Sequence, residues 1–234
     1  MPVISFVSPK GGAGKTTAAL LLSTELAQKG IPVTVIDADP EQWIRRWGEG
    51  GQIPAAMSIA DRPTEETIIE QIDRARTGSA FVVVDLEGSS NMLVAYAISR
   101  SDLVVIPTQA STMDGKSAAR AIKLVKQQER GFSKTIPFAV LFTRTSAAIK
   151  SRMQANLVEQ LSKADVPTFH TQLLERNAYK AIFEFGTTLE GLPSRTYKLD
   201  EAIHNARAFA GEVISVAKQC NTAPGEQPGE EAAA

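Results

Sequence analysis

The sequence contains little cysteine, histidine or aromatic residue. Its 234 residues include one cysteine, Cys220, and two histidines, and aromatic side chains make up 6% of the chain. A single cysteine excludes an internal disulfide bond and any metal site built on several thiolates of one chain.

The sequence also lacks a long apolar run and an excess of charge. No run approaches the roughly 20 apolar residues that a membrane-spanning helix needs, and no basic segment followed by an apolar stretch opens the chain. We therefore expect a cytoplasmic protein. The formal net charge of -1 indicates no partner, because a nucleic acid responds to where cations cluster rather than to their sum.

The length and the hydrophobic content of 43% predict one globular domain, at residues 1–220. Residues 221–234 contain proline, glycine and three glutamates but no lysine or arginine. This segment has no apolar periodicity, so we predict a disordered acidic tail.

Short apolar runs alternate with helical patterns along the chain. The runs lie at 3–7, 33–36, 81–84, 104–107 and 137–142, and the helical patterns lie near 15–30, 64–76, 116–130, 151–163 and 199–218. Continuous β-branched runs are typical of strands that helices cover on both sides. We predict an α/β fold with a doubly wound, mostly parallel sheet and helices on both faces. Ligands of such sheets bind beyond the carboxyl ends of the strands, where Lys10, Asp37 and Asp85 fall.

The first apolar run leads into a glycine-rich loop and then a helical segment. The loop residues are Lys10, Gly11, Gly12, Ala13, Gly14, Lys15, Thr16 and Thr17. Glycines let backbone N–H groups turn toward a phosphate, and the helix N-terminus adds partial positive charge. In this pattern Lys15 would reach the β- and γ-phosphates, and the Thr16 hydroxyl would ligate Mg²⁺. The alternative is a glycine-rich turn that happens to precede a helix.

With Lys10, the loop resembles the K-G-G-x-G-K-T signature of the ParA/MinD family of deviant Walker A ATPases, and the resemblance covers most of the chain. It implies a protein of the small ParA type, similar also to the ParA-like ATPase of T-DNA transfer. The resemblance implies that Lys10 crosses a homodimer interface to the ATP of the opposite subunit, and that Lys10 and Lys15 are both catalytic. The alternative for Lys10 is a solvated loop lysine.

The resemblance also implies roles for acids at the ends of two runs. Residues 37–40 look like the family's D-x-D-P segment, in which Asp39 orients the attacking water and Asp37 lies near the metal. The alternative is that one of these acids caps a helix that begins near Glu41. The run at 81–85 fits a Walker B strand whose Asp85 holds a magnesium-bound water. Relatives usually continue with a Pro-Pro turn, whereas this chain continues with Leu-Glu-Gly-Ser, and we interpret Glu87 as a surface residue in preference to a second acid of the site.

Two further segments complete the implied nucleotide site. Residues 101–107, followed by Asp114, resemble the family's strand and loop beside the nucleotide. Thr143 lies where many relatives have an adenine-recognising asparagine, and it offers only a hydroxyl. The preference for ATP therefore follows from the resemblance alone, as does slow, partner-stimulated hydrolysis. Mg²⁺ as a cofactor follows from the loop pattern and from the resemblance. An iron–sulfur reductase of the nitrogenase iron-protein type shares the loop but needs two ligand cysteines per subunit, so Cys220 alone excludes it.

The distribution of charged residues bears on whether the protein binds a membrane or DNA. MinD-type relatives bind membranes through a basic amphipathic C-terminal helix, whereas this chain ends in acidic residues, so we expect no membrane binding. The residues closest to the DNA-contacting positions of ParA relatives are Lys150, Arg152 and Lys180. The alternative for each is a solvated helix face. A second cluster at helical spacing, Lys116, Arg120, Lys123 and Arg130, we interpret as a solubilising stripe in slight preference to a DNA surface.

The resemblance, together with these charge patterns, implies a nucleoid-associated ParA-like ATPase that binds DNA non-specifically. A centromere-binding protein or cargo adaptor would stimulate it, and it would partition or position a plasmid, chromosome region or protein cargo. The alternative is a nucleotide-dependent cargo or polarity scaffold of the MinD-like type, which binds protein partners without DNA.

Overall fold

A seven-stranded sheet forms the centre of the computed structural model, which describes residues 1–51, 53–88, 91–147, 152–193 and 197–222. The strand order is β3-β2-β4-β1-β5-β6-β7, and all neighbouring strands pair in parallel. The strands are β1 (Val3–Phe6), β2 (Val33–Ala38), β3 (Met57–Ile59), β4 (Phe81–Leu86), β5 (Leu103–Thr108), β6 (Phe138–Thr145) and β7 (Leu173–Leu174). The predicted parallel α/β sheet is confirmed.

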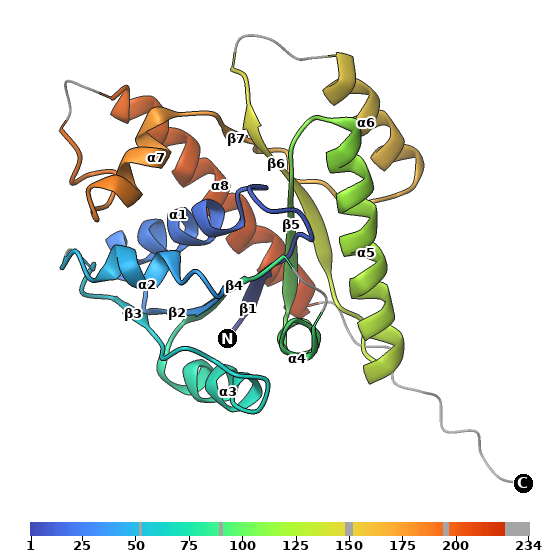
Figure 1. Cartoon of the computed structure of the whole chain (residues 1–234), viewed down its shortest axis with the longest axis horizontal. Coiled ribbons are helices and arrows are strands. Elements are labelled where there is room, and N and C mark those ends of the chain that lie inside the picture. Colours follow the sequence, from blue (N-terminus) through green and yellow to red (C-terminus); the bar gives the residue numbers. More distant parts are fainter. Residues whose placement is uncertain (52, 89–90, 148–151, 194–196, 223–234) are drawn as a thin grey trace, which may run out of the picture.

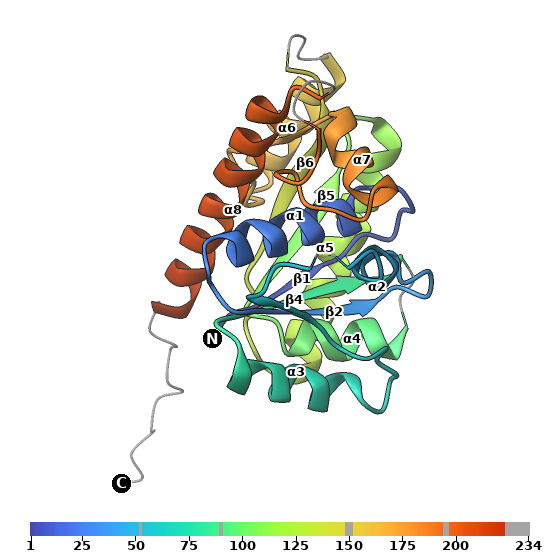
Figure 2. The same ribbon diagram turned by 90° about the vertical axis from the view of Figure 1, so that its left-hand side faces the viewer.

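Helices cover both faces of this sheet (Figures 1 and 2). One face packs against α1 (Lys15–Gln28), α2 (Trp43–Gly48), α7 (Asn177–Glu184) and α8 (Leu199–Thr222). The other face packs against α3 (Ile68–Gly78), α4 (Met92–Ser99), α5 (Thr112–Phe132) and α6 (Arg152–Lys163). Phe81 and Val83 of β4 point into the first core, and Val82 and Val84 point into the second. The strands read as continuous apolar runs because both of their faces are buried.

The strand order brings the functional candidates to one edge of the sheet. β1 lies between β4 and β5, and β4 also pairs with β2. In this register Phe6, the last residue of β1, and Asp37 of β2 both lie opposite Asp85 of β4. The loop after β1 therefore begins beside both acids, at the place where connections leave β1 and β5 in opposite directions.

Some elements were not predicted from the sequence. Two edge strands, β3 and β7, contain three and two residues, which is too short for a periodicity. The short helices α4 and α7 were missed as well, whereas α2 begins close to Glu41, where the capping alternative placed a helix. Helix α8 runs to Thr222, so the predicted tail lies outside the described residues from position 223 onward. No helix in the described ranges is long and apolar enough to cross a membrane.

Candidate functional site

The loop between β1 and α1 has the backbone shape of an anion-binding loop. Gly12 and Gly14 have φ values of 74° and 93°, a left-handed region that favours glycine. Gly14 is also the N-cap of α1, where it makes no side-chain capping bond, and the first turn of α1 has no acidic residue. The first N–H groups of α1 are therefore available to a negatively charged ligand.

Lys15 is buried at the start of α1, and it forms no ion pair with any residue that the structure describes. Its positive charge is one of the influences that oppose the rise in the pKa of Asp85 described below. A buried ammonium group without a carboxylate partner is costly unless an anion binds beside it. This arrangement fits a lysine that receives phosphate oxygens.

Asp85 is fully buried at the end of β4, and no described residue other than Thr16 offers its carboxylate oxygens a hydrogen bond. Burial raises the pKa of Asp85 to about 8, and the charge of Asp37 adds to the rise, while the Thr16 hydroxyl and Lys15 oppose it. A buried carboxylate of this kind is stabilised by a cation. Mg²⁺ is bound through one or two carboxylates together with phosphate oxygens and waters, so Asp85 and Thr16 fit a magnesium site. No group of three or more His, Cys, Asp or Glu side chains in the described ranges could hold a metal ion by itself.

Asp37 and Asp39 have different local bonds. Asp37 Oδ2 accepts hydrogen bonds from the backbone N–H groups of Ile44 (2.9 Å) and Arg45 (3.0 Å) at the start of α2. Burial raises the pKa of Asp37, and these backbone bonds oppose the rise. Asp39 is half-buried, and its Oδ1 accepts from Glu41 N–H at 3.0 Å. The helix-capping alternative therefore applies to Asp37, whereas Asp39 only closes a short turn.

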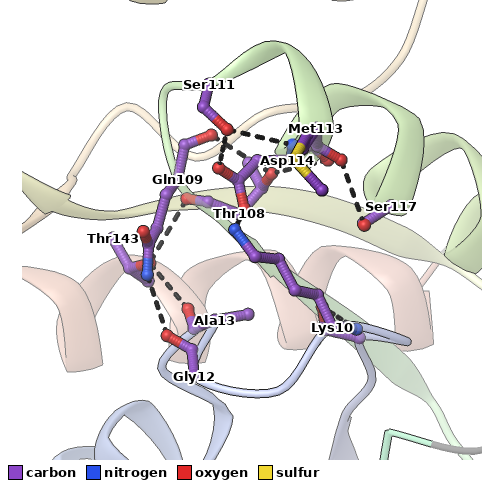
Figure 3. A network of polar contacts seen from close by, with 11 residues as sticks. Lys10, Gly12, Ala13, Thr108, Gln109, Ser111, Met113, Asp114, Ser117 and Thr143 are labelled. Atoms are coloured by element: carbon purple, nitrogen blue, oxygen red, sulfur yellow. Dashed lines mark hydrogen bonds and ion pairs between the residues drawn. The ribbon is translucent and has the colours of Figure 1, made fainter.

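Lys10 forms an ion pair with a residue 104 positions away in the sequence. Its Nζ donates to Asp114 Oδ1 at 2.7 Å, and the Lys10 side chain remains 34% exposed while Asp114 is 2% exposed. Asp114 also accepts a short hydrogen bond from the Ser111 hydroxyl at the N-cap of α5 (Figure 3). The Lys10 ammonium therefore lies at the surface beside the loop, and its partner is within the same chain.

The loop is also tied to the ends of β5 and β6. Gln109 Nε2 donates to Gly12 O at 2.8 Å, and Thr143 Oγ1 donates to Ala13 O at 2.7 Å (Figure 3). The structure thus places Thr143 beside the loop, with its hydrogen donated to a loop carbonyl. Gln109 was missed at the sequence level, and its position directly after a buried strand was the available signal.

Of the candidate DNA-binding residues, the structure describes Arg152 and Lys180, which lie on helices that cover opposite faces of the sheet. Lys180 lines a cleft with Gly14, Thr17 and Thr143 and pairs with Glu175 at 3.2 Å. Arg152 is exposed at the start of α6, and Lys150 lies outside the described residues. Glu87, interpreted above as a surface residue, is half-buried and accepts a short hydrogen bond from Asn91, the N-cap of α4.

Known proteins similar to this chain identify its family. The family model described as VirC1 protein matches residues 1–198. Protein ParA of Rhizobium radiobacter is 39% identical over 210 residues, which is 90% of this chain and 95% of that protein. The chain belongs to the VirC1/ParA family. Protein virC1 of the same species is 29% identical over 229 residues, covering 93% of this chain and 96% of that protein.

A solved structure shares the fold of this chain. A putative plasmid partition protein from Borrelia burgdorferi bound to AMPPNP has a TM-score of 0.68 and 19% identity, covering 92% of this chain and 98% of that one. At this identity the likeness shows the shared fold alone. ParA/MinD-type proteins are P-loop ATPases. The loop from Lys10 to Thr17 has the corresponding sequence pattern, and we call it the P-loop.

Proposed function

We propose that this chain is an ATP-hydrolysing switch that forms a homodimer around ATP, binds DNA non-specifically in that state, and partitions or positions a DNA or protein cargo. The observation that carries the proposal is the position of Lys10. Its ammonium lies at the rim of the loop between β1 and α1, half-exposed, and Asp114 is its one ion-pair partner among the residues that the structure describes. A second cation at the edge of a triphosphate site suits a nucleotide enclosed between two copies of the chain.

Four residues would share the hydrolytic chemistry. Lys15 and the N–H groups of the loop bind the phosphates, Thr16 and Asp85 hold Mg²⁺ and its water, and Asp39 orients the attacking water. Bound Mg²⁺ supplies neutralisation of phosphate charge. Asp37 shapes this site by fixing the start of α2, through its bonds to Ile44 and Arg45. We expect turnover to be slow without a stimulating partner.

The outer face of α5 supports DNA binding better than the residues first considered. Lys116, Arg120, Lys123 and Arg130 are all exposed, and none of them pairs with an acid that the structure describes. They lie opposite the buried face of α5, which includes Ala118, Ala121 and Val125. We call these four residues the α5 basic stripe. Along a helix rising about 1.5 Å per residue, the stripe spans about 21 Å, which is long enough to meet several phosphates.

One feature favours the alternative scaffold function, in which protein partners replace DNA. A groove between α5 and α6 is lined by Ile122, Leu157 and Leu161, and the exposed Met153 lies at its edge. An exposed methionine beside an apolar groove suits an adaptable protein contact. The same groove would suit a stimulating partner under the main proposal, so it does not distinguish the two functions. Whether the protein binds DNA distinguishes the DNA-binding switch from the protein scaffold.

The test is fluorescence anisotropy with an arbitrary duplex, with and without ATP, across a salt series. We expect ATP-dependent binding that weakens steeply with salt. A Lys116→Glu, Arg120→Glu, Lys123→Glu variant should lose three phosphate contacts. Each contact contributes roughly 0.9 to the slope of the logarithm of the association constant against the logarithm of the salt concentration, so the slope should become shallower by about 3. The matched control is Lys163→Glu, which changes an exposed lysine already paired with Glu159. A Lys150→Glu, Arg152→Glu, Lys180→Glu variant tests the other surface, and no binding by the wild type at low salt would leave the scaffold function.

A further inference from the structure

Two side chains outside the P-loop hold two consecutive carbonyl groups of that loop. Thr143, near the end of β6, donates to Ala13 O, and Gln109, directly after β5, donates to Gly12 O (Figure 3). We propose that Thr143 and Gln109 are positioning residues that set the P-loop in its phosphate-binding shape before nucleotide arrives. We call the pair the loop clamp. The proposal rests on nucleotide binding at this loop, as proposed above.

The planarity of the peptide bond explains how a carbonyl contact can orient an N–H group. In a trans peptide the C=O of one residue and the N–H of the next lie in one plane and point in opposite directions. A bond that fixes the Gly12 carbonyl therefore fixes the N–H of Ala13, and a bond that fixes the Ala13 carbonyl fixes the N–H of Gly14. The clamp draws both carbonyls away from the phosphate side and turns both N–H groups toward it.

Burial makes the Thr143 half of the clamp the stronger one. Thr143 and Ala13 are 3% and 1% exposed, so their bond is shielded from water. The hydroxyl has one hydrogen, and Ala13 O at 2.7 Å is a closer acceptor than Thr108 O at 3.3 Å. A carbonyl that lost this donor would stay buried without a partner, which costs more than the loss of an exposed bond. Gln109 is half-exposed, so water can replace its amide.

The packing around Thr143 agrees with a role in positioning. A Cβ added to Gly14 would lie 3.4 Å from Cβ, Cγ2 and Oγ1 of Thr143. The methyl group and the hydroxyl of Thr143 therefore both lie on the side of Gly14 where a side chain would project. Arg144, the next residue, has a φ of 51° at a register shift between β6 and β7, a backbone strain of the kind found near functional sites.

The same strand offers a matched control. Thr145 is 4% exposed, and its buried Oγ1 has no hydrogen-bond partner among the described residues. Thr143→Val and Thr145→Val are the same chemical change two residues apart, but only the first removes a donor from the P-loop. Any difference between them reports the Thr143–Ala13 bond rather than a general effect of valine in β6.

Two measurements test the clamp, one with nucleotide and one without. We expect Thr143→Val to raise the Kd of fluorescent ATP and ADP analogues about 10-fold and Gln109→Met about 3-fold, in line with one buried and one exposed hydrogen bond. Thr143→Ser, which keeps the donor, should stay within about 2-fold of the wild type. In the nucleotide-free protein, hydrogen exchange of the amides of Ala13 and Gly14 should be faster in Thr143→Val than in Thr145→Val.

Wild-type affinity and wild-type loop exchange in Thr143→Val would overturn the proposal, and so would equal effects of Thr143→Val and Thr145→Val. If the buried Thr143→Val variant fails to fold, Gln109→Met decides alone, and unchanged exchange of the Ala13 amide in that variant overturns the clamp. If the wild type binds no nucleotide, the proposed function fails, while loop exchange in the nucleotide-free protein still tests the clamp.

Discussion

Glu25→Gln should make the protein more stable at neutral and alkaline pH. Glu25 lies in α1 and is 2% exposed, and its Oε2 accepts from Arg207 Nε of α8 at 3.3 Å. Burial raises the pKa of Glu25 from 4.5 to about 7, the charge of Glu190 adds to this, and Arg207 and Lys29 oppose it. Burial raises the pKa of Tyr179 in α7, and the charge of Glu25 adds to that rise.

The sign follows from the raised pKa of Glu25. The folded protein holds the Glu25 proton more tightly than the unfolded chain does. The contribution of Glu25 to the free energy of unfolding is therefore largest below pH 4.5 and is lost as the pH rises through about 7. A rise of this size corresponds to roughly 3 kcal/mol. Glutamine resembles the protonated acid, so Glu25→Gln should match the wild type near pH 4.5 and exceed its stability by roughly 2–3 kcal/mol at pH 8.

Urea unfolding of the nucleotide-free protein between pH 4.5 and 8.5 measures this difference. Asp85, whose pKa is also raised, gives a slope of the same sign in both proteins, so the comparison isolates Glu25. Glu190→Gln is the control, and it should flatten the wild-type slope only partly because it removes the smaller of the two raising causes. A Glu25→Gln variant that is less stable than the wild type at pH 8 would show that the ionised Glu25 carboxylate does not destabilise the folded protein.

Two further substitutions test the catalytic and surface assignments. Asp39→Ala should keep nucleotide binding and the ATP-dependent dimer while lowering turnover by roughly 100-fold or more, as expected for a lost water-positioning carboxylate, and phosphate release at the wild-type rate would remove Asp39 from its role. Asp114→Asn replaces the ion pair to Lys10 with a neutral hydrogen bond, so Lys10 leaves more easily and the dimer should form about 3- to 10-fold more tightly in sedimentation experiments with ATP. Weaker dimers in that variant would show that Asp114 does not compete for Lys10.

The strands of the central sheet were predictable because burial on both faces makes them continuous apolar runs. The central strands β1, β2, β4, β5 and β6 were all found in this way, and their parallel arrangement was confirmed. Helix α4 was missed because nearly all of its residues are apolar, so it shows no helical period. The glycine-rich loop between β1 and α1 was recognisable because its residues are adjacent in the sequence, and its phosphate binding stays a prediction.

The contacts around the P-loop were not predictable, because they join residues far apart in the sequence. Thr143 and Ala13 are separated by 130 positions, and Lys10 and Asp114 by 104. Sequence patterns placed Thr143 near the nucleotide base through resemblance to relatives, but its hydrogen-bond partner depends on the local geometry of β6. The sequence also left open which acid bonds to the start of α2, because Asp37 and Asp39 are two residues apart and fit the same pattern.

The most direct test of the central claim is the oligomeric state of Lys10→Ala with a non-hydrolysable ATP analogue, measured by analytical ultracentrifugation beside the wild type. We predict that the wild type dimerises only with the analogue, and that Lys10→Ala binds the nucleotide as a monomer and forms no dimer. A Lys10→Ala protein that dimerises as tightly as the wild type, or a wild type that stays monomeric with saturating analogue, would contradict it.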